Sequence, residues 1–295
     1  MPEINLTKKY YRLSLRLAIA GLLSLAIPLE VNASSELRNR QLKSSIPDEA
    51  VSFDFFGLFK GAVQYVQVAN ISDEEEVEIG KQINQQLLSQ QYELYNNQQV
   101  QGYVDNIGQE LVNSADSSRD IPYSFEVVVS DAVNAFATPG GFIYVTTGLL
   151  QEADNKAQLA SVIAHEIAHI NEKHSVRALK RAAIAQGIAE TAGVSTNTLA
   201  QIGYQLAVDL PQSREYEYEA DQVGLEILQQ GGYPPMAFVN FLKQLQGGNQ
   251  PEFLRTHPTS TNRIEALAQE IESSSASSNK GLDEADYQNN LLSLL

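Results

Sequence analysis

The sequence predicts an α+β fold that is mostly helical and carries a small antiparallel sheet. Apolar residues recur at helical spacing in several segments, and two short runs typical of strands, at 123–129 and 141–147, lie among them. The chain has 295 residues, of which 43% are hydrophobic, so it can bury one sizeable core. We therefore expect one main domain at 71–272 with an appendage at each end.

Residues 1–33 have the pattern of a signal peptide. A basic start precedes an apolar run of 13 residues at 17–29, which is short for a membrane span, and Val31 and Ala33 suit signal peptidase. Cleavage before Ser34 is the prediction, with an uncleaved anchor as the alternative. No later segment reaches the run of about 18 apolar residues that a membrane helix needs. We expect an exported protein of the periplasm or an equivalent lumen, soluble or peripherally bound to a membrane.

The two appendages have distinct compositions. Residues 34–70 include the aromatic run SFDFFGLF and predict an N-terminal arm that packs on the main domain or contacts a membrane or partner surface. Residues 273–280 are rich in serine, so residues 273–295 are predicted to form a flexible C-terminal tail.

Composition excludes several classes of function. The chain has no cysteine, which removes disulfides, thiolate metal ligands and cysteine nucleophiles. Residues 1–33 hold four basic and two acidic side chains, and the remaining chain has 16 basic and 34 acidic ones, a formal charge of −18. Because phosphate binding needs clustered Lys and Arg, we expect no nucleic-acid partner.

The main domain begins with two predicted amphipathic helices. Ser72 and Glu75 have the spacing of a capping box, and Ile79 starts a row of apolar residues four apart. Residues 98–114 repeat this apolar pattern.

The two strand-like runs follow, and then the remaining helices. The turn signal Pro139-Gly140-Gly141 lies before the second run. Further helices are predicted at 155–178, 213–228, 235–246 and 261–272.

Three of the four histidines lie on the predicted helix at 155–178. His165 and His169 are four residues apart, so both face the same side of a helix, and Glu166 is adjacent. In this H-E-x-x-H pattern the histidines bind zinc, which lowers the pKa of a bound water, and the glutamate relays the proton.

His174 is the nearest candidate for a third ligand, and helical geometry argues against it. It follows His169 by five residues, about 140° further round a continuous helix, and no glycine ends that helix. His174 is therefore interpreted as a structural or surface histidine.

A carboxylate from the segment REYEYEAD is the other candidate for the third ligand. This segment holds two pairs with helical i, i+4 spacing, Glu215 with Glu219 and Glu217 with Asp221. One carboxylate would bind the metal, and the second would accept the free ring N–H of a ligating histidine. Spacing alone does not choose between the pairs.

These motifs together resemble a known family. HEIAHINEKH and SREYEYEAD, with NAFATPGGFIYVTTGLL before them and RTHPTSTNRI after them, are similar to the HtpX-like and CAAX-prenyl-protease-like zinc metalloproteases, peptidase family forty-eight. The likeness covers about residues 70–270 and is closest to the soluble periplasmic branch. It implies a gluzincin metallopeptidase domain with its small sheet beside the active-site helix, and one Zn²⁺ per chain.

The resemblance also implies roles for single residues. Glu217 would be the third zinc ligand, Asp221 its hydrogen-bonding neighbour, and Arg263 would steady the oxyanion. His257 would lie near the metal, either restraining activity from the open site or donating a hydrogen bond in the transition state. The substrate-binding edge strand would include the residues Asn134, Ala135, Phe136, Ala137, Gly140 and Gly141.

The leading hypothesis is a zinc metalloendopeptidase that cleaves unfolded or misfolded envelope proteins, with His165, His169 and Glu217 as ligands and Glu166 as general base. A peripheral membrane or outer-membrane assembly partner is a further expectation. The first alternative is a chaperone or assembly factor that binds clients and rarely cuts them. The second is a purely structural zinc site, which an adjacent glutamate and only three protein ligands disfavour.

Overall fold

The computed structural model describes residues 65–189, 193–209, 213–247, 251–259, 261–273 and 278–295. Contacts divide the chain into two units, residues 1–60 and 61–295, and the description concerns the second. The predicted signal peptide and most of the predicted arm lie outside the described residues.

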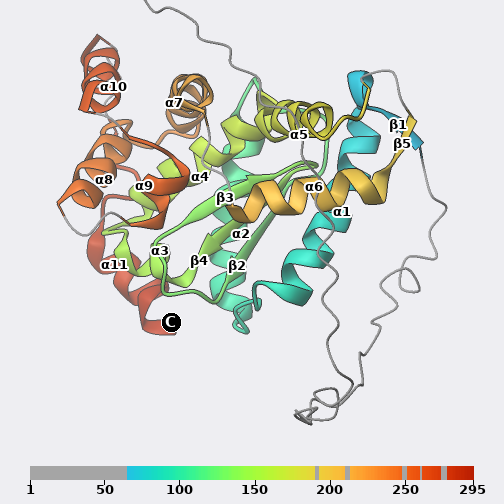
Figure 1. Cartoon of the computed structure of the whole chain (residues 1–295). Coiled ribbons are helices and arrows are strands. Elements are labelled where there is room, and N and C mark those ends of the chain that lie inside the picture. The colour runs from blue at the N-terminus through green and yellow to red at the C-terminus, as the bar shows by residue number, and fades with distance from the viewer. Residues whose placement is uncertain (1–64, 190–192, 210–212, 248–250, 260, 274–277) are drawn as a thin grey trace, which may run out of the picture. The chain divides into compact units, whose positions relative to one another are not determined.

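Helices make up most of the described chain, as predicted, and the strands are short (Figure 1). The elements in chain order are β1 (Tyr65–Gln67), the 3-10 helix η1 (Val68–Asn70), α1 (Asp73–Gln90), α2 (Gln98–Ser114), β2 (Ser124–Val128), β3 (Ala135–Thr138), β4 (Phe142–Thr146), α3 (Thr147–Glu152), α4 (Lys156–Asn171), α5 (His174–Ala185), β5 (Gly193–Ser195), α6 (Thr196–Asp209), α7 (Arg214–Gln230), α8 (Met236–Gln246), α9 (Glu252–Thr256), α10 (Thr261–Ser273), α11 (Glu284–Asn290) and η2 (Leu292–Leu294).

The main sheet is mixed, not purely antiparallel as predicted. Its strand order is β2-β4-β3, with β4 parallel to β2 and antiparallel to β3. A third strand causes this difference, because β3 lies between the two predicted runs in sequence and returns through a tight turn to place β4 beside β2. In that turn Gly140 and Gly141 have φ of 83° and 91°, values that glycine adopts without strain. A second, two-stranded sheet joins β1 to β5.

Alternating side chains of the main sheet enter two hydrophobic cores. Ala135, Ile143 and Val145 pack in the core that contains residues of α2 and α4. Phe136 and Tyr144, on the opposite face, pack in the core built from α1, α5 and α6. The sheet therefore separates two helical layers, and Figure 1 shows α6 crossing the sheet in front of β3 and β4.

The first predicted helix begins at the predicted cap. The side chain of Ser72 accepts a hydrogen bond from the backbone N–H of Glu75, and the Glu75 carboxylate accepts one from the N–H of Ser72. Ile79, Ile83 and Leu87 are fully buried, as their spacing predicts. Among the described residues, no helix has the length and apolar character needed to cross a membrane.

The predicted helix at 155–178 is wrong at its C-terminal end. Helix α4 ends at Asn171, and α5 begins at His174 after a break at Lys173, whose φ of 54° is left-handed. The ammonium group of Lys173 lies 2.6 Å from the carboxylate of Asp73 on α1, which fixes the break. The break changes the direction in which His174 projects.

The predicted flexible tail is wrong for residues 278–295. Tyr287 and Leu291 are fully buried in the core that contains α4, and the Tyr287 hydroxyl donates a hydrogen bond of 2.8 Å to the carbonyl of Leu150. Asp283 caps α11. These residues belong to the main domain, because their apolar side chains complete its core.

The loop 91–97 covers the outer edge of β2. Leu94 forms an antiparallel bridge with Val128, the N–H of Tyr95 donates to the carbonyl of Val127, and the N–H of Val129 donates to that of Glu93. The opposite edge of the sheet belongs to β3.

Candidate metal centre

Four side chains from three parts of the chain meet in one buried cluster. His165 and His169 come from α4, Glu217 from α7, and His257 directly follows α9. One ligand atom of each lies within 4.8 Å of the others. The Nε2 atoms of His165 and His169 are 3.1 Å apart, and each is 3.4 Å from an oxygen of Glu217. All four residues are at most 1% exposed.

Close packing of α4 on α7 brings Glu217 to the histidines. A Cβ atom on Gly224 of α7 would lie 3.1 Å from the Cα of His165, so glycine permits this approach. Ser213 caps α7, and its side chain accepts a hydrogen bond from the N–H of Tyr216. Glu217 therefore lies in the first turn of α7, where the helix dipole favours a carboxylate.

Glu166 lies beside the cluster as a buried carboxylate. Burial raises the pKa of Glu166 above its usual value. Neither of its oxygens makes a hydrogen bond within the described part of the chain, although Oε1 lies 3.2 Å from His257 Nε2. Burying a carboxylate without a hydrogen-bond partner costs free energy, unless a bound ligand supplies that partner. Such an available carboxylate is expected of a general base.

The donor set fits a divalent metal ion. Burial lowers the pKa of His169 well below its usual value, so this ring is neutral with a lone pair available. Burial opposes the charge of Glu217, but the surrounding histidines hold the pKa of its carboxyl well below its usual range. Two imidazoles and one carboxylate are the ligand types of catalytic zinc sites.

Asp221 and Arg263 contact residues of this cluster. An oxygen of Asp221 lies 3.2 Å from Nδ1 of His165. Burial opposes protonation of His165, but the carboxylates of Asp221 and Glu217 raise its pKa to about 9. Arg263 contacts Asp221 through Nε and Nη2, and its Nη1 lies 2.7 Å from Glu217 Oε2.

The contacts of Arg263 support a role other than the expected one, which stays a prediction. The resemblance implied that it steadies the oxyanion, but the guanidinium is 1% exposed and binds the carboxylates of Asp221 and Glu217. We therefore infer that it orients these two carboxylates.

His257 connects the cluster to the edge strand. Its Nδ1 lies 3.1 Å from Glu217 Oε1, and its Nε2 lies 3.3 Å from the carbonyl oxygen of Ala135 on β3. Asn134 helps to place it, because the amide oxygen of Asn134 accepts a hydrogen bond from the hydroxyl of Thr256. The outer edge of β3 therefore lies at the cluster.

The predicted substrate strand divides into two parts. The carbonyls of Ala135 and Ala137 point to the outer edge of β3, where they contact His257 and Ser175. Phe136 is buried, and its ring stacks on Tyr144 in the core.

Gly140 and Gly141 lie in the turn after β3, and their role in substrate binding stays a prediction. Their backbone packs closely against Val77 and Pro122, and the N–H of Gly140 donates to the carboxylate of Glu76. They shape the turn after β3.

Of the two interpretations of His174, structural or surface histidine, the structure agrees with the first. It is fully buried, and its Nδ1 lies 2.9 Å from Nδ1 of His169. Its Nε2 lies 2.9 Å from the carboxylate of Glu219, which Arg177 also binds. The contact with His169 was not foreseen, because the prediction assumed a continuous helix, whereas Lys173 has a left-handed φ between α4 and α5.

The comparison with known families agrees with this geometry. The profile of peptidase family M48 matches residues 98–271, which is more than half of the chain and includes the whole cluster. The chain belongs to peptidase family M48. The predicted family is thereby confirmed, and the domain around the cluster is an M48 metallopeptidase domain.

Named proteases are among the proteins that this M48 domain resembles. The chain is 34% identical over 184 residues to the beta-barrel assembly-enhancing protease of Yersinia pestis, covering 55% of this chain and 37% of that protein. The same-named protein of Escherichia coli K12 is 30% identical, covering 58% and 39%. The mitochondrial metalloendopeptidase OMA1 of Saccharomyces cerevisiae is 31% identical, covering 56% and 54%. The matched part thus spans about two fifths to one half of these relatives.

Within the M48 domain, the structure places the two carboxylate pairs differently. Glu217 and Asp221 are buried at the histidines, whereas Glu215 is exposed and Glu219 contacts His174. The sequence showed the i, i+4 spacing of Glu215 and Glu219. It did not show that Glu219 contacts His174, because that contact depends on the break between α4 and α5.

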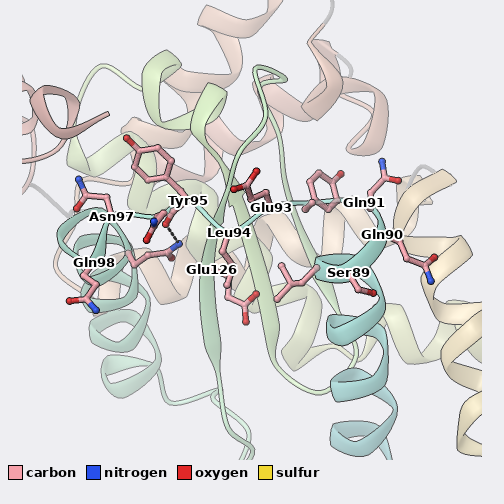
Figure 2. A pocket seen from close by; sticks show the side chains of 13 residues that line it. Ser89, Gln90, Gln91, Glu93, Leu94, Tyr95, Asn97, Gln98 and Glu126 are labelled. Atoms are coloured by element: carbon pink, nitrogen blue, oxygen red, sulfur yellow. Dashed lines mark hydrogen bonds between the residues drawn. The ribbon is translucent and has the colours of Figure 1, made fainter. Parts of the chain in front are cut away.

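Within the described residues, two of the hollows lie outside the cluster of His165, His169, Glu217 and His257. Figure 2 shows the larger, about 760 Å³, between the end of α1, the loop 91–97 and Glu126, where Gln90, Gln91 and Asn97 line it with amides. None of the four cluster residues lines it. The smaller, about 330 Å³, lies beside Ala137 at the end of β3, against α5 and α6.

Proposed function

We propose that this protein is a zinc-dependent metalloendopeptidase that holds one Zn²⁺ per chain. His165, His169 and Glu217 would be its ligands. The observation that carries the proposal is the buried Glu166 carboxylate, without a hydrogen bond among the described residues, beside this ligand set. A structural zinc site would not need such a group.

The protein's own residues would then divide the work of peptide hydrolysis. Bound zinc would supply Lewis-acid polarisation and lower the pKa of water at the site. Glu166 would take a proton from the attacking water and give it to the leaving amine, since its raised pKa suits both steps. Asp221 would hold Nδ1 of His165, and Arg263 would orient Asp221 and Glu217.

The outer edge of β3 supports an extended peptide as substrate. Backbone pairing along an edge strand recognises unfolded chain with little dependence on side chains. We therefore propose misfolded or damaged envelope proteins as substrates, in the periplasm or an equivalent lumen after export. The relatives named for beta-barrel assembly support this setting and an outer-membrane assembly partner.

The smaller hollow would accept one substrate side chain. A peptide antiparallel to β3 runs from Ala137 towards Ala135, so residues near Ala137 precede the scissile bond. Ala178, Ala182 and Leu206 make the walls largely apolar. A leucine- or phenylalanine-sized side chain on the amino-terminal side of the bond is the proposed occupant.

His257 would restrain this activity. Its ring nitrogens lie within reach of the ligand group, and it contacts the Ala135 carbonyl on the edge where a substrate would pair. A role as transition-state hydrogen-bond donor remains the competing proposal, and removing the ring separates the two.

The test uses the full chain with unfolded casein, with and without a chelator. We expect cleavage that the chelator abolishes and zinc restores. Glu166→Gln should keep stoichiometric zinc and lower kcat about 10²- to 10⁴-fold. Casein binding without chelator-sensitive cleavage would support the chaperone alternative, and full turnover by Glu166→Gln would refute the mechanism.

A further inference from the structure

We propose that Glu219 and His174 form a relay that fixes the proton of His169, so that its Nε2 is free to bind zinc. His174 is thus a positioning residue. The inference rests on the proposed metal centre and extends it to residues outside the ligand group.

If His169 binds zinc through Nε2, the hydrogen bond between the rings of His169 and His174 can run in only one direction. Nε2 of His169 faces His165 and Glu217, so Nδ1 must carry the proton when Nε2 binds a metal. That Nδ1 lies 2.9 Å from Nδ1 of His174. The His169 N–H therefore donates, and His174 accepts through an unprotonated Nδ1.

The carboxylate of Glu219 enforces this direction. A neutral His174 with an unprotonated Nδ1 has its proton on Nε2, which lies 2.9 Å from Glu219 Oε2 and donates to it. In the reverse arrangement, Nε2 of His174 would direct its lone pair at the carboxylate, and Nε2 of His169 would carry a proton. Glu219 thus disfavours the arrangement that cannot bind zinc.

The surroundings hold each member of the relay in place. The Arg177 guanidinium lies 2.6 Å from the same oxygen of Glu219. The His174 ring stacks on Tyr216, with centroids 4.3 Å apart and planes at 14°. Lys173 has a left-handed backbone conformation and α5 begins at the next residue, so the break between the two helices lies directly before His174.

The two ligating histidines are therefore held differently. His165 meets the carboxylate of Asp221 directly, whereas His169 meets that of Glu219 through a second imidazole. Removing such partners of ligating histidines typically weakens metal binding 10- to 100-fold.

The test measures zinc affinity of the full chain by competition with a chelating dye. His174→Phe keeps a ring to stack on Tyr216 but removes both nitrogens, and we expect about 10- to 100-fold weaker zinc binding. His174→Asn places an amide oxygen near the position of Nδ1, so it should recover most of the affinity. A merely structural role would make both variants lose thermal stability without this difference in affinity.

Glu219→Gln is the second variant, chosen because residue 219 is partly exposed and its replacement leaves no cavity. It removes the charge that selects the tautomer and should weaken zinc binding less than His174→Phe. Glu215→Gln, at an exposed position of the same helix, is the matched control and should bind zinc like the wild type.

The outcomes separate the relay from the metal centre. Zinc-loaded wild type should show proton-bound Nδ1 on His169 and proton-bound Nε2 on His174 in nitrogen NMR spectra of the imidazoles. Unchanged affinity in folded His174→Phe overturns the relay, and if that variant fails to fold, unchanged affinity in Glu219→Gln overturns it. A wild-type protein that binds no zinc would refute the metal centre itself.

Discussion

Arg263 lies 1% exposed between the carboxylates of Asp221 and Glu217, so its charge compensates two buried acids. Its planar fork contacts Asp221 through two nitrogens and Glu217 through the third. Lysine cannot reproduce this geometry with a single ammonium group.

Arg263→Met should therefore lower the free energy of unfolding of the chelator-treated protein by about 3–5 kcal/mol, because it removes one partner of a buried ion-pair cluster and leaves two carboxylates with less compensating charge. Urea unfolding measures this loss. Arg263→Lys should restore part of the stability but less of the zinc affinity, and equal recovery of both would contradict an orienting role for the fork.

His257→Ala tests the two roles of this ring. If His257 restrains the site, its removal frees the Ala135 carbonyl and the position beside Glu166, so casein cleavage should rise. The measurement is the initial rate at saturating zinc, with zinc content determined in parallel. A fall in that rate with full zinc occupancy would favour the transition-state donor.

At the scale of single elements, α5 is placed by the break that precedes it. Helix α1 contributes Asp73, which contacts both Lys173 at the break and Arg119, and Arg119 also donates to the carbonyl of Ile170 near the end of α4. These contacts tie the break to two other elements.

The contribution of Asp73 should depend on pH. A hydrogen bond from Lys173, together with Arg119, lowers the pKa of Asp73 below its ordinary value near 3.8. The stabilisation is therefore present above that value and is lost as the pH falls through the lower folded pKa. Urea midpoints between pH 6 and 3 should fall less in Asp73→Asn than in wild type. Glu74→Gln, at an exposed neighbour, should behave like wild type.

The hollow beside β3 is a second test at the level of elements. Ala178→Phe should fill it and lower kcat/KM about tenfold for peptides with a large apolar residue before the scissile bond. Peptides with glycine there should be cleaved as before. Ile184→Phe adds bulk at an exposed position of α5 outside the hollow and is the control. Equal losses on both peptides would contradict the subsite.

At the scale of the whole described domain, the C-terminal residues complete the core around α4. Tyr287→Ala should cost about 3–5 kcal/mol of stability, because it removes a fully buried ring. Tyr287→Phe should cost about 1–3 kcal/mol, since only the hydrogen bond to Leu150 is lost. Thermal unfolding compares them. A loss below 1 kcal/mol for alanine would mean that α11 adds little to the core.

The sequence predicted those features that depend on local chemistry. The capping box at Ser72 and the apolar spacing of α1 and α2 were sufficient to place these helices. The pair His165 and His169, with Glu166 between them, was also readable, because i, i+4 spacing brings side chains together on any helix.

The features that sequence missed depend on contacts distant in the chain. Lys173 adopts a left-handed conformation although it is not a glycine. Its side chain contacts Asp73, 100 residues earlier in the chain, so no local signal marks the break. The parallel pairing of β2 and β4 arises because β3 takes the outer position. Tyr287 packs in a core that also contains residues of α2, α3 and α4. The serine-rich segment before it gives no sign of this packing.

The two edges of the main sheet differ in the groups that cover them. An exposed strand edge can recruit other chains and template aggregation, a hazard for any protein that handles unfolded polypeptides. Here the loop 91–97 already hydrogen-bonds to the edge of β2, whereas the edge of β3 meets the side chains of His257 and Ser175. Under the proposed function, a bound chain would extend the sheet in one direction only, so that the strand it adds would end at the proposed metal centre and would not seed a growing stack.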